Sequence, residues 1–87
     1  PAIISDAARR GGAPIIAGTS TRVTDVALRY ELLGMAPDEI AQALPHLSLA
    51  QIHCALSYYY EHKQRFDAEW RAEQRALRRA RRGAPSL

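Results

Sequence analysis

Cysteine is almost absent from this sequence of 87 residues: Cys54 stands alone, so no disulfide can form within the chain. A single free cysteine is typical of a reducing compartment. No apolar run approaches the length of a membrane span, and the N-terminal residues lack the apolar core of a signal peptide. We therefore expect a cytoplasmic protein, and its length allows one small domain.

Residue spacings that would indicate catalysis or metal binding are also missing. His46, His53 and His62 fall in no Cys-x-x-Cys, His-x-x-x-His or His-Glu-x-x-His pattern. No serine lies in a nucleophile-elbow context, and no pair of carboxylates is framed for acid–base chemistry. We therefore expect no catalytic residue, no metal, no cofactor and no small-molecule substrate, which means that the protein is not an enzyme.

Charge is distributed unevenly along the chain. Residues 1–60 carry four arginines against five acids, a formal charge of −1. Residues 61–87 carry eight basic residues against four acids, a formal charge of +4, and five of the eight lie within residues 75–82, where there is no acid. This asymmetry indicates an acidic partner, either a nucleic acid or an acidic protein cleft. It also divides the chain into a near-neutral domain over 1–60 and a basic arm over 61–87.

The N-terminal part of the domain predicts a β-hairpin and a first helix. Residues 1–13 are expected to be irregular, whereas the β-prone runs 14–17 and 21–23 flank a glycine-containing turn and predict a hairpin. The helix is expected to begin after an N-cap at Thr24 and to stop at Gly34. Its apolar residues form two stripes, so a second surface must cover it, which we take to be the dimer contact. The residues expected in this contact are Ile15, Ile16, Val23, Leu28 and Leu32.

Two further helices are expected to complete a helix-turn-helix core. The second begins with Pro37 at its first position and is ended by Pro45. The third begins at Ser48, which forms a capping box with Gln51. The residues that give the second helix its inward face are Ile40, Ala43 and Leu44.

The third helix meets no stop signal before Gly83-Ala84-Pro85, although a break near residues 60–62 is the alternative, because three consecutive tyrosines are mediocre helix formers. Its apolar residues follow one line on a helical wheel, namely Leu49, Ile52, Leu56, Tyr59, Phe66, Trp70 and Leu77. The predicted fold class is therefore mainly α. It consists of a short N-terminal β-hairpin, a three-helix helix-turn-helix core, and a third helix that extends into a C-terminal helical arm.

The outer face of the third helix is the part of a helix-turn-helix that enters the major groove of DNA. Gln51 could pair with adenine edges, while basic side chains and the helix N-terminus contact phosphates. The residues expected to bind DNA are Arg22, Arg29, Ser48, Gln51, His53 and Ser57. The alternative is a merely solvated face, since no Lys or Arg lies between Met35 and His62.

Three linked motifs over residues 12–60 resemble a known family. They are Gly12–Thr19 (GAPIIAGT), Leu32–Ile40 (LLGMAPDEI) and Pro45–Ile52 (PHLSLAQI). They are similar to motifs of the VapB-type antitoxins, small helix-turn-helix proteins long catalogued as a domain of unknown function. The resemblance implies an antitoxin encoded beside a PIN-type ribonuclease toxin that it neutralises, and a complex that represses its own operon by binding operator DNA.

The arm is where we expect the toxin to bind. Its narrow apolar stripe suits an amphipathic helix laid in a groove, and arginines can pair bidentately with the carboxylates that the resemblance implies at the metal site of a PIN-type nuclease. The residues expected to contact the toxin are Phe66, Trp70, Arg71, Arg75, Leu77, Arg78 and Arg79. In the alternative, Phe66 and Trp70 fold back on their own domain or on its dimer mate, and the arginines are solvated.

Two other functions stay open at this point. One is a dimeric protein-interaction module that does not bind DNA, which the missing basic residues of the third helix favour. The other is a nucleic-acid binder that uses the basic arm.

Overall fold

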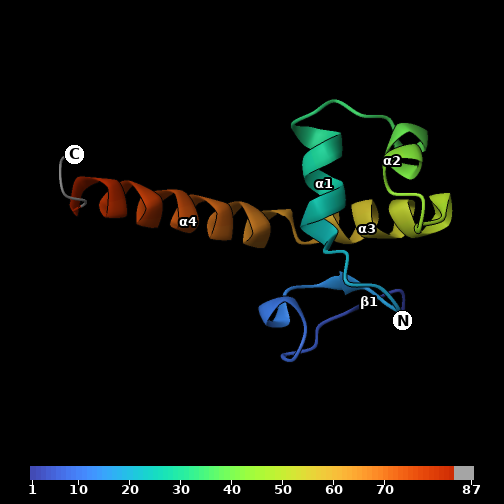
Figure 1. Cartoon of the computed structure of the whole chain (residues 1–87), viewed down its shortest axis with the longest axis horizontal. Helices are drawn as coiled ribbons and strands as arrows, with labels where there is room; N and C mark the ends of the chain where they lie inside the picture. Colours follow the sequence, from blue (N-terminus) through green and yellow to red (C-terminus); the bar gives the residue numbers. More distant parts are fainter. Residues whose placement is uncertain (84–87) are drawn as a thin grey trace.

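The computed structural model describes residues 1–83 as a short antiparallel β-hairpin followed by four helices, the last of which is long (Figure 1). This confirms the predicted fold class. The elements are β1 (Ile3–Ile4), the 3₁₀ turn η1 (Arg10–Gly12), β2 (Ile15–Ile16), α1 (Val23–Glu31), α2 (Pro37–Ala43), α3 (Leu49–Glu61) and α4 (Lys63–Gly83). No helix within the described residues is both long and apolar enough to cross a membrane.

The hairpin forms, but its strands are not the predicted pair. Ile3 and Ile4 of β1 pair with Ile16 and Ile15 of β2, so the prediction that residues 1–13 are irregular is wrong at these two positions. The predicted partner, residues 21–23, contributes one bridge between Ile15 and Arg22. The chain can return to β2 because Gly11 and Gly12 adopt positive φ angles of 65° and 83°, a conformation that costs glycine little.

The N-cap of the first helix lies two residues before the expected one. Arg22, not Thr24, is the residue that precedes α1, and its backbone N–H donates to the Asp25 carboxylate at 2.9 Å. This bond satisfies one of the donors that a helix start leaves without a partner. The predicted stop is confirmed at Gly34, which adopts a φ of 66° just past the helix.

The helix-turn-helix has the predicted caps. Pro37 occupies the first turn of α2 and the Glu39 carboxylate accepts the backbone N–H of Ala36 at 2.9 Å. At the start of α3, the Gln51 N–H donates to Ser48 Oγ at 3.1 Å and the Ser48 N–H donates to Gln51 Oε1 at 2.8 Å. The Ser48–Gln51 capping box is therefore confirmed.

One hydrophobic core joins β2 and the four helices. Its members are Ile16, Val23, Val26, Ala27, Ile40, Leu47, Ile52, Ala55, Leu56, Tyr59 and Phe66. Ile40 and the partly buried Leu44 face inward as expected, but Ala43 is exposed and the prediction for it is wrong. Because α2 has only seven residues, Ile40, Ala41 and Leu44 already cover its side of the core.

The third helix breaks at His62, which confirms the alternative of a break in this region. His62 has φ −118° and ψ 24°, outside the helical range, and its ring lies 4.2 Å from that of Tyr58 between centroids. From the break α4 runs away from the body formed by the other elements (Figure 1). Phe66 is the only buried residue of α4. The expected stop at Gly83-Ala84-Pro85 lies mostly outside the described residues, and α4 is helical through Gly83.

Candidate interaction surfaces

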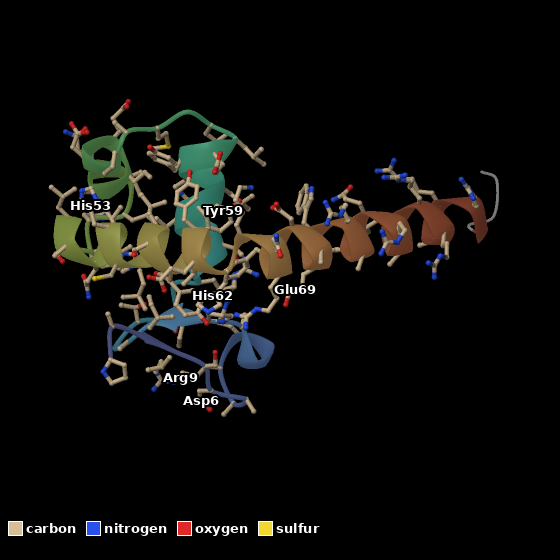
Figure 2. The ribbon with its side chains drawn as sticks, turned by 180° about the vertical axis from the view of Figure 1, so that it is seen from behind. Asp6, Arg9, His53, Tyr59, His62 and Glu69 are labelled. Carbon is tan, nitrogen blue, oxygen red and sulfur yellow. The ribbon has the colours of Figure 1, made fainter. Side chains whose placement is uncertain are left out.

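The outward face of α3 presents few polar side chains that are free to read a base. His53, labelled in Figure 2, and Ser57 are exposed there, beside the exposed Cys54. Ser48 Oγ and Gln51 Oε1 instead accept hydrogen bonds from the backbone of their own helix start. Four of the residues expected to bind DNA belong to this helix or its N-cap. Of these, only His53 and Ser57 can contact DNA without breaking the capping box.

Arg22 and Arg29 both turn toward Asp25. Arg22 Nη2 lies 2.8 Å from Asp25 Oδ1, and Arg29 Nη1 donates to the backbone carbonyl of Asp25 at 2.7 Å. Burial opposes ionisation of Asp25, but hydrogen bonds from the side chain and backbone of Arg22 outweigh it and lower the pKa of this carboxyl. The Asp25 hydrogen bond in turn raises the pKa of Arg22. Arg22 is thus half of a neutral pair rather than a free cation for a phosphate.

The structure divides the residues expected at a dimer contact into two groups. Ile15, Ile16 and Val23 are buried within their own chain, so they offer no side-chain surface to a second copy. Leu28 of α1 and Leu32, the residue that follows α1, are 40% and 66% exposed and remain on the surface. The fold of a single chain accounts for the first group, because Ile16 and Val23 belong to its own core and Ile15 pairs with Ile4 of β1.

The apolar stripe of the arm is split in the same way. Phe66 is 6% exposed and packs against Tyr59, with ring centroids 5.5 Å apart, and against Tyr58 at 6.2 Å. This corresponds to the alternative in which Phe66 folds back on its own domain. Trp70 and Leu77, by contrast, are 48% and 50% exposed on the same helix. The free stripe of α4 therefore begins at Trp70.

From Arg71 onward the arginines of the arm are exposed and lack ion-pair partners within the part of the chain that the structure describes. The four expected toxin contacts in this group are Arg71, Arg75, Arg78 and Arg79. Arg65, nearer the body, is 4.0 Å from Glu69 and donates to the Tyr58 hydroxyl at 3.1 Å. A guanidinium without an internal partner is available for an external carboxylate or phosphate.

A groove of about 470 Å³ between α1 and α4 is the feature that the sequence did not reveal. Its apolar lining comes from Ala27, Leu28, Leu32, Tyr59, Phe66 and Trp70, and its acidic residues are Glu31, Asp67, Glu69 and Glu73. Figure 2 shows Tyr59 beside α1 and Glu69 on the first part of α4. The second apolar stripe of α1, which contains Leu28 and Leu32, is the sequence signal that pointed toward this surface.

One contact between two helices and one contact within α4 hold the edge of this groove. The Tyr60 hydroxyl of α3 donates to Glu31 of α1 at 2.6 Å, and this bond raises the pKa of Tyr60 to about 12. Lys63 Nζ lies 3.1 Å from Asp67 Oδ2 at the start of α4. Within residues 1–83 no cluster of three or more His, Cys, Asp or Glu side chains could hold a metal ion.

The comparison with known proteins gives a family for the chain. The sequence profile of the family described as "Protein of unknown function (DUF433)" matches residues 3–59, which run from β1 through nearly all of α3. The chain therefore belongs to this family. No curated protein and no solved structure matches it significantly. The matched region ends before α4, so the arm lies outside it.

Proposed function

We propose that this member of the DUF433 family is an antitoxin that neutralises a PIN-type ribonuclease through its α4 arm and represses its own operon as a DNA-binding dimer. It acts by binding and not by catalysis. The observation that carries the proposal is the arm beyond Phe66. There, Trp70 and Leu77 are half exposed on one helix, amid arginines that form no ion pair within the described residues.

This arm has the properties of a helix that binds in a groove. Trp70 and Leu77 are seven residues apart, two helical turns, so they lie on the same face of α4. Trp and Arg are the residues that most often dominate binding energy at protein interfaces. α4 has few contacts with the body beyond Phe66, and a partner's groove would supply the apolar burial that the free arm lacks.

The arginines supply the inhibitory chemistry in this proposal. A guanidinium forms two parallel hydrogen bonds with a carboxylate, and such charge-assisted bonds are roughly twice as strong as neutral ones. A nuclease that holds its metal with clustered carboxylates presents the matching acids. Arg71, Arg75, Arg78 and Arg79 would pair with these acids, so that neither metal nor RNA could occupy the site.

Repression of the operon is assigned to the helix-turn-helix of α2 and α3. His53 and Ser57 are exposed on the outward face of α3 and are the candidates for contact with base edges. Arg22 and Arg29 would contact phosphates after exchanging their bonds to Asp25 for bonds to DNA. Such binding must weaken steeply as salt rises, because phosphate contacts release counterions.

The neutralisation is tested by reversing charge on the arm. The chain is co-expressed with the product of the neighbouring reading frame, and RNA cleavage by the purified mixture is measured. The triple variant Arg75→Glu/Arg78→Glu/Arg79→Glu is expected to lose inhibition, whereas the matched body variant Arg9→Glu/Arg10→Glu keeps it. Inhibition by the triple variant at wild-type strength, or a neighbouring product that cleaves no RNA, would overturn the proposal.

A second candidate function is a protein-interaction module that does not bind DNA. The bonds of Ser48 and Gln51 within the capping box, and of Arg22 and Arg29 to Asp25, favour it, because they occupy four of the six expected DNA contacts. A gel shift with the DNA upstream of the chain's own gene, titrated with salt, separates the two. A shift that weakens steeply with salt and is lost in His53→Ala/Ser57→Ala supports repression, and no shift at low salt supports the module.

A further inference from the structure

The groove between α1 and α4 is an apolar surface that the described chain leaves open. Leu28 and Leu32 form its α1 wall and Trp70 its α4 wall, and all three are at least two-fifths exposed. Phe66 and Tyr59 close its floor against the core. Exposed leucines and a tryptophan gathered around one groove mark a surface that gains free energy when a partner covers it.

The charge of the groove restricts what can cover it. Four acids line it, namely Glu31, Asp67, Glu69 and Glu73. Lys63 pairs with Asp67 at 3.1 Å, but Arg65 reaches Glu69 only at 4.0 Å, and Glu73 makes no ion pair within residues 1–83. The other cation of the lining, Arg22, is held by Asp25 at 2.8 Å. The groove therefore favours an occupant that has an apolar face with basic flanks.

One segment of the described chain has this composition. Leu77 is exposed on α4 amid five arginines of residues 75–82, and no acid lies in that stretch. It cannot fill the groove of its own chain, because α4 is itself one wall and Leu77 lies about 10 Å beyond Trp70 along a continuous helix. The complementary segment must come from another molecule.

We propose that the occupant is the arm of a second copy, so that two chains clasp each other's arms antiparallel about a twofold axis. The seven-residue spacing of Trp70 and Leu77 is the same in both directions, so antiparallel arms that place Leu77 beside the partner's Trp70 also place Trp70 beside the partner's Leu77. In this register the levels of Arg78 and Arg81 bracket that of the partner's Asp67, and all three residues lie on the same side of the line through Trp70 and Leu77. Both arms are thereby paired with opposite charge.

This dimer differs from the one expected from sequence, which included the buried Ile15, Ile16 and Val23. It retains Leu28 and Leu32, now as the wall against which the second arm packs. It needs no property of the ribonuclease, although a further consequence rests on the proposed function. An arm held by a second copy is closed to a ribonuclease, so the two partners would compete for Trp70 and Leu77.

The first test measures the mass of the full chain alone by analytical ultracentrifugation, with far-ultraviolet circular dichroism as the check on folding. The wild type is expected to sediment as a dimer of 9.7 kDa chains. Leu77→Asp is expected to weaken the dissociation constant at least about tenfold, whereas Ala72→Asp on the opposite face of α4 leaves it unchanged. A monomeric wild type, or equal dimerisation by both variants, would refute the proposed antiparallel dimer.

A charge-exchange pair then tests which surfaces meet. Variant A carries Asp67→Arg, and variant B carries Arg78→Glu/Arg81→Glu. Each alone sets like charges against each other and is expected to be monomeric, while a mixture restores attraction in both grooves and forms a heterodimer. A mixture that stays monomeric, or a variant A that dimerises alone as well as the wild type, would contradict the assignment. Neither outcome bears on whether the arm inhibits a ribonuclease, which is measured separately.

Discussion

Phe66 divides α4 into a part that belongs to the body and a part that is free, and its truncation is the sharpest test of that division. The side chain is 6% exposed and packs on Tyr58 and Tyr59. Truncating a buried phenylalanine to alanine costs about 3–5 kcal/mol. Phe66 also borders the open groove, where neighbours can relax into the space, so we expect the lower end, about 3 kcal/mol. Small domains have only about 5–15 kcal/mol of stability in total, so this loss is large.

The measurement is a urea titration followed by circular dichroism, at one protein concentration too low for dimers to form, because dimerisation shifts apparent stability. Trp70→Ala is the matched control on the next turn of the same helix, and we expect it to cost under about 1 kcal/mol because half of its side chain is already exposed. The division of α4 at Phe66 is wrong if Phe66→Ala lowers the free energy of unfolding by less than about 1 kcal/mol. It is also wrong if Trp70→Ala costs as much as Phe66→Ala.

Three smaller perturbations test local features of the fold by the same titration or by thermal melting. Ser48→Ala removes the oxygen that caps α3 and is expected to cost about 1 kcal/mol, while Ser48→Asp keeps most of the stability; equal losses would argue against the cap. Gly34→Ala is expected to cost about 1–2 kcal/mol from its φ of 66° alone, since no atom lies near the added methyl group, and a neutral result would contradict the left-handed stop. The pKa of Asp25 is lowered in the folded state. Its contribution to the free energy of unfolding is therefore fully present at pH values above its ordinary pKa of 3.8, and it is lost as the pH falls through the lower pKa of the folded state. Asp25→Asn should therefore lower the melting temperature at neutral pH, and the two curves should converge in strong acid; a constant difference at all pH values would exclude this linkage.

Local features of the fold could be predicted from the sequence because a few neighbouring residues determine them. The capping box of Ser48 and Gln51 and the left-handed stop at Gly34 each involve residues within about one helical turn. The break near His62 could be named only as an alternative, because tyrosine is a mediocre helix former without being a breaker.

The pairing of β1 with β2 could not be predicted in this way. β1 has two residues, too few for a strand pattern, and its partner lies more than ten positions along the chain. Side-chain preference predicts the N-cap of α1 at Thr24. In the structure the Asp25 carboxylate accepts the N–H of Arg22, so the N-cap is Arg22, two residues earlier in the chain. Contacts that depend on two distant or competing partners leave little trace in a single sequence.

The candidate site was predicted in part for the same reason. The exposure of Trp70 and Leu77 and the basic end of the arm follow from composition and helical spacing. The burial of Phe66 depends on the angle between α3 and α4, and the groove depends on how α1 crosses α4. The periodicity of a single helix does not determine either of these two helix–helix geometries.

The central claim is that the free stripe of α4 binds an acidic ribonuclease, and calorimetric titration of the neighbouring gene product with the full chain tests it most directly. The double variant Trp70→Ala/Leu77→Ala is compared with Leu33→Ala/Leu49→Ala, which removes two exposed leucines of the body. We predict that the arm variant weakens the dissociation constant by at least about a hundredfold and the body variant by less than about threefold. Equal affinity of the arm variant and the wild type would contradict the account.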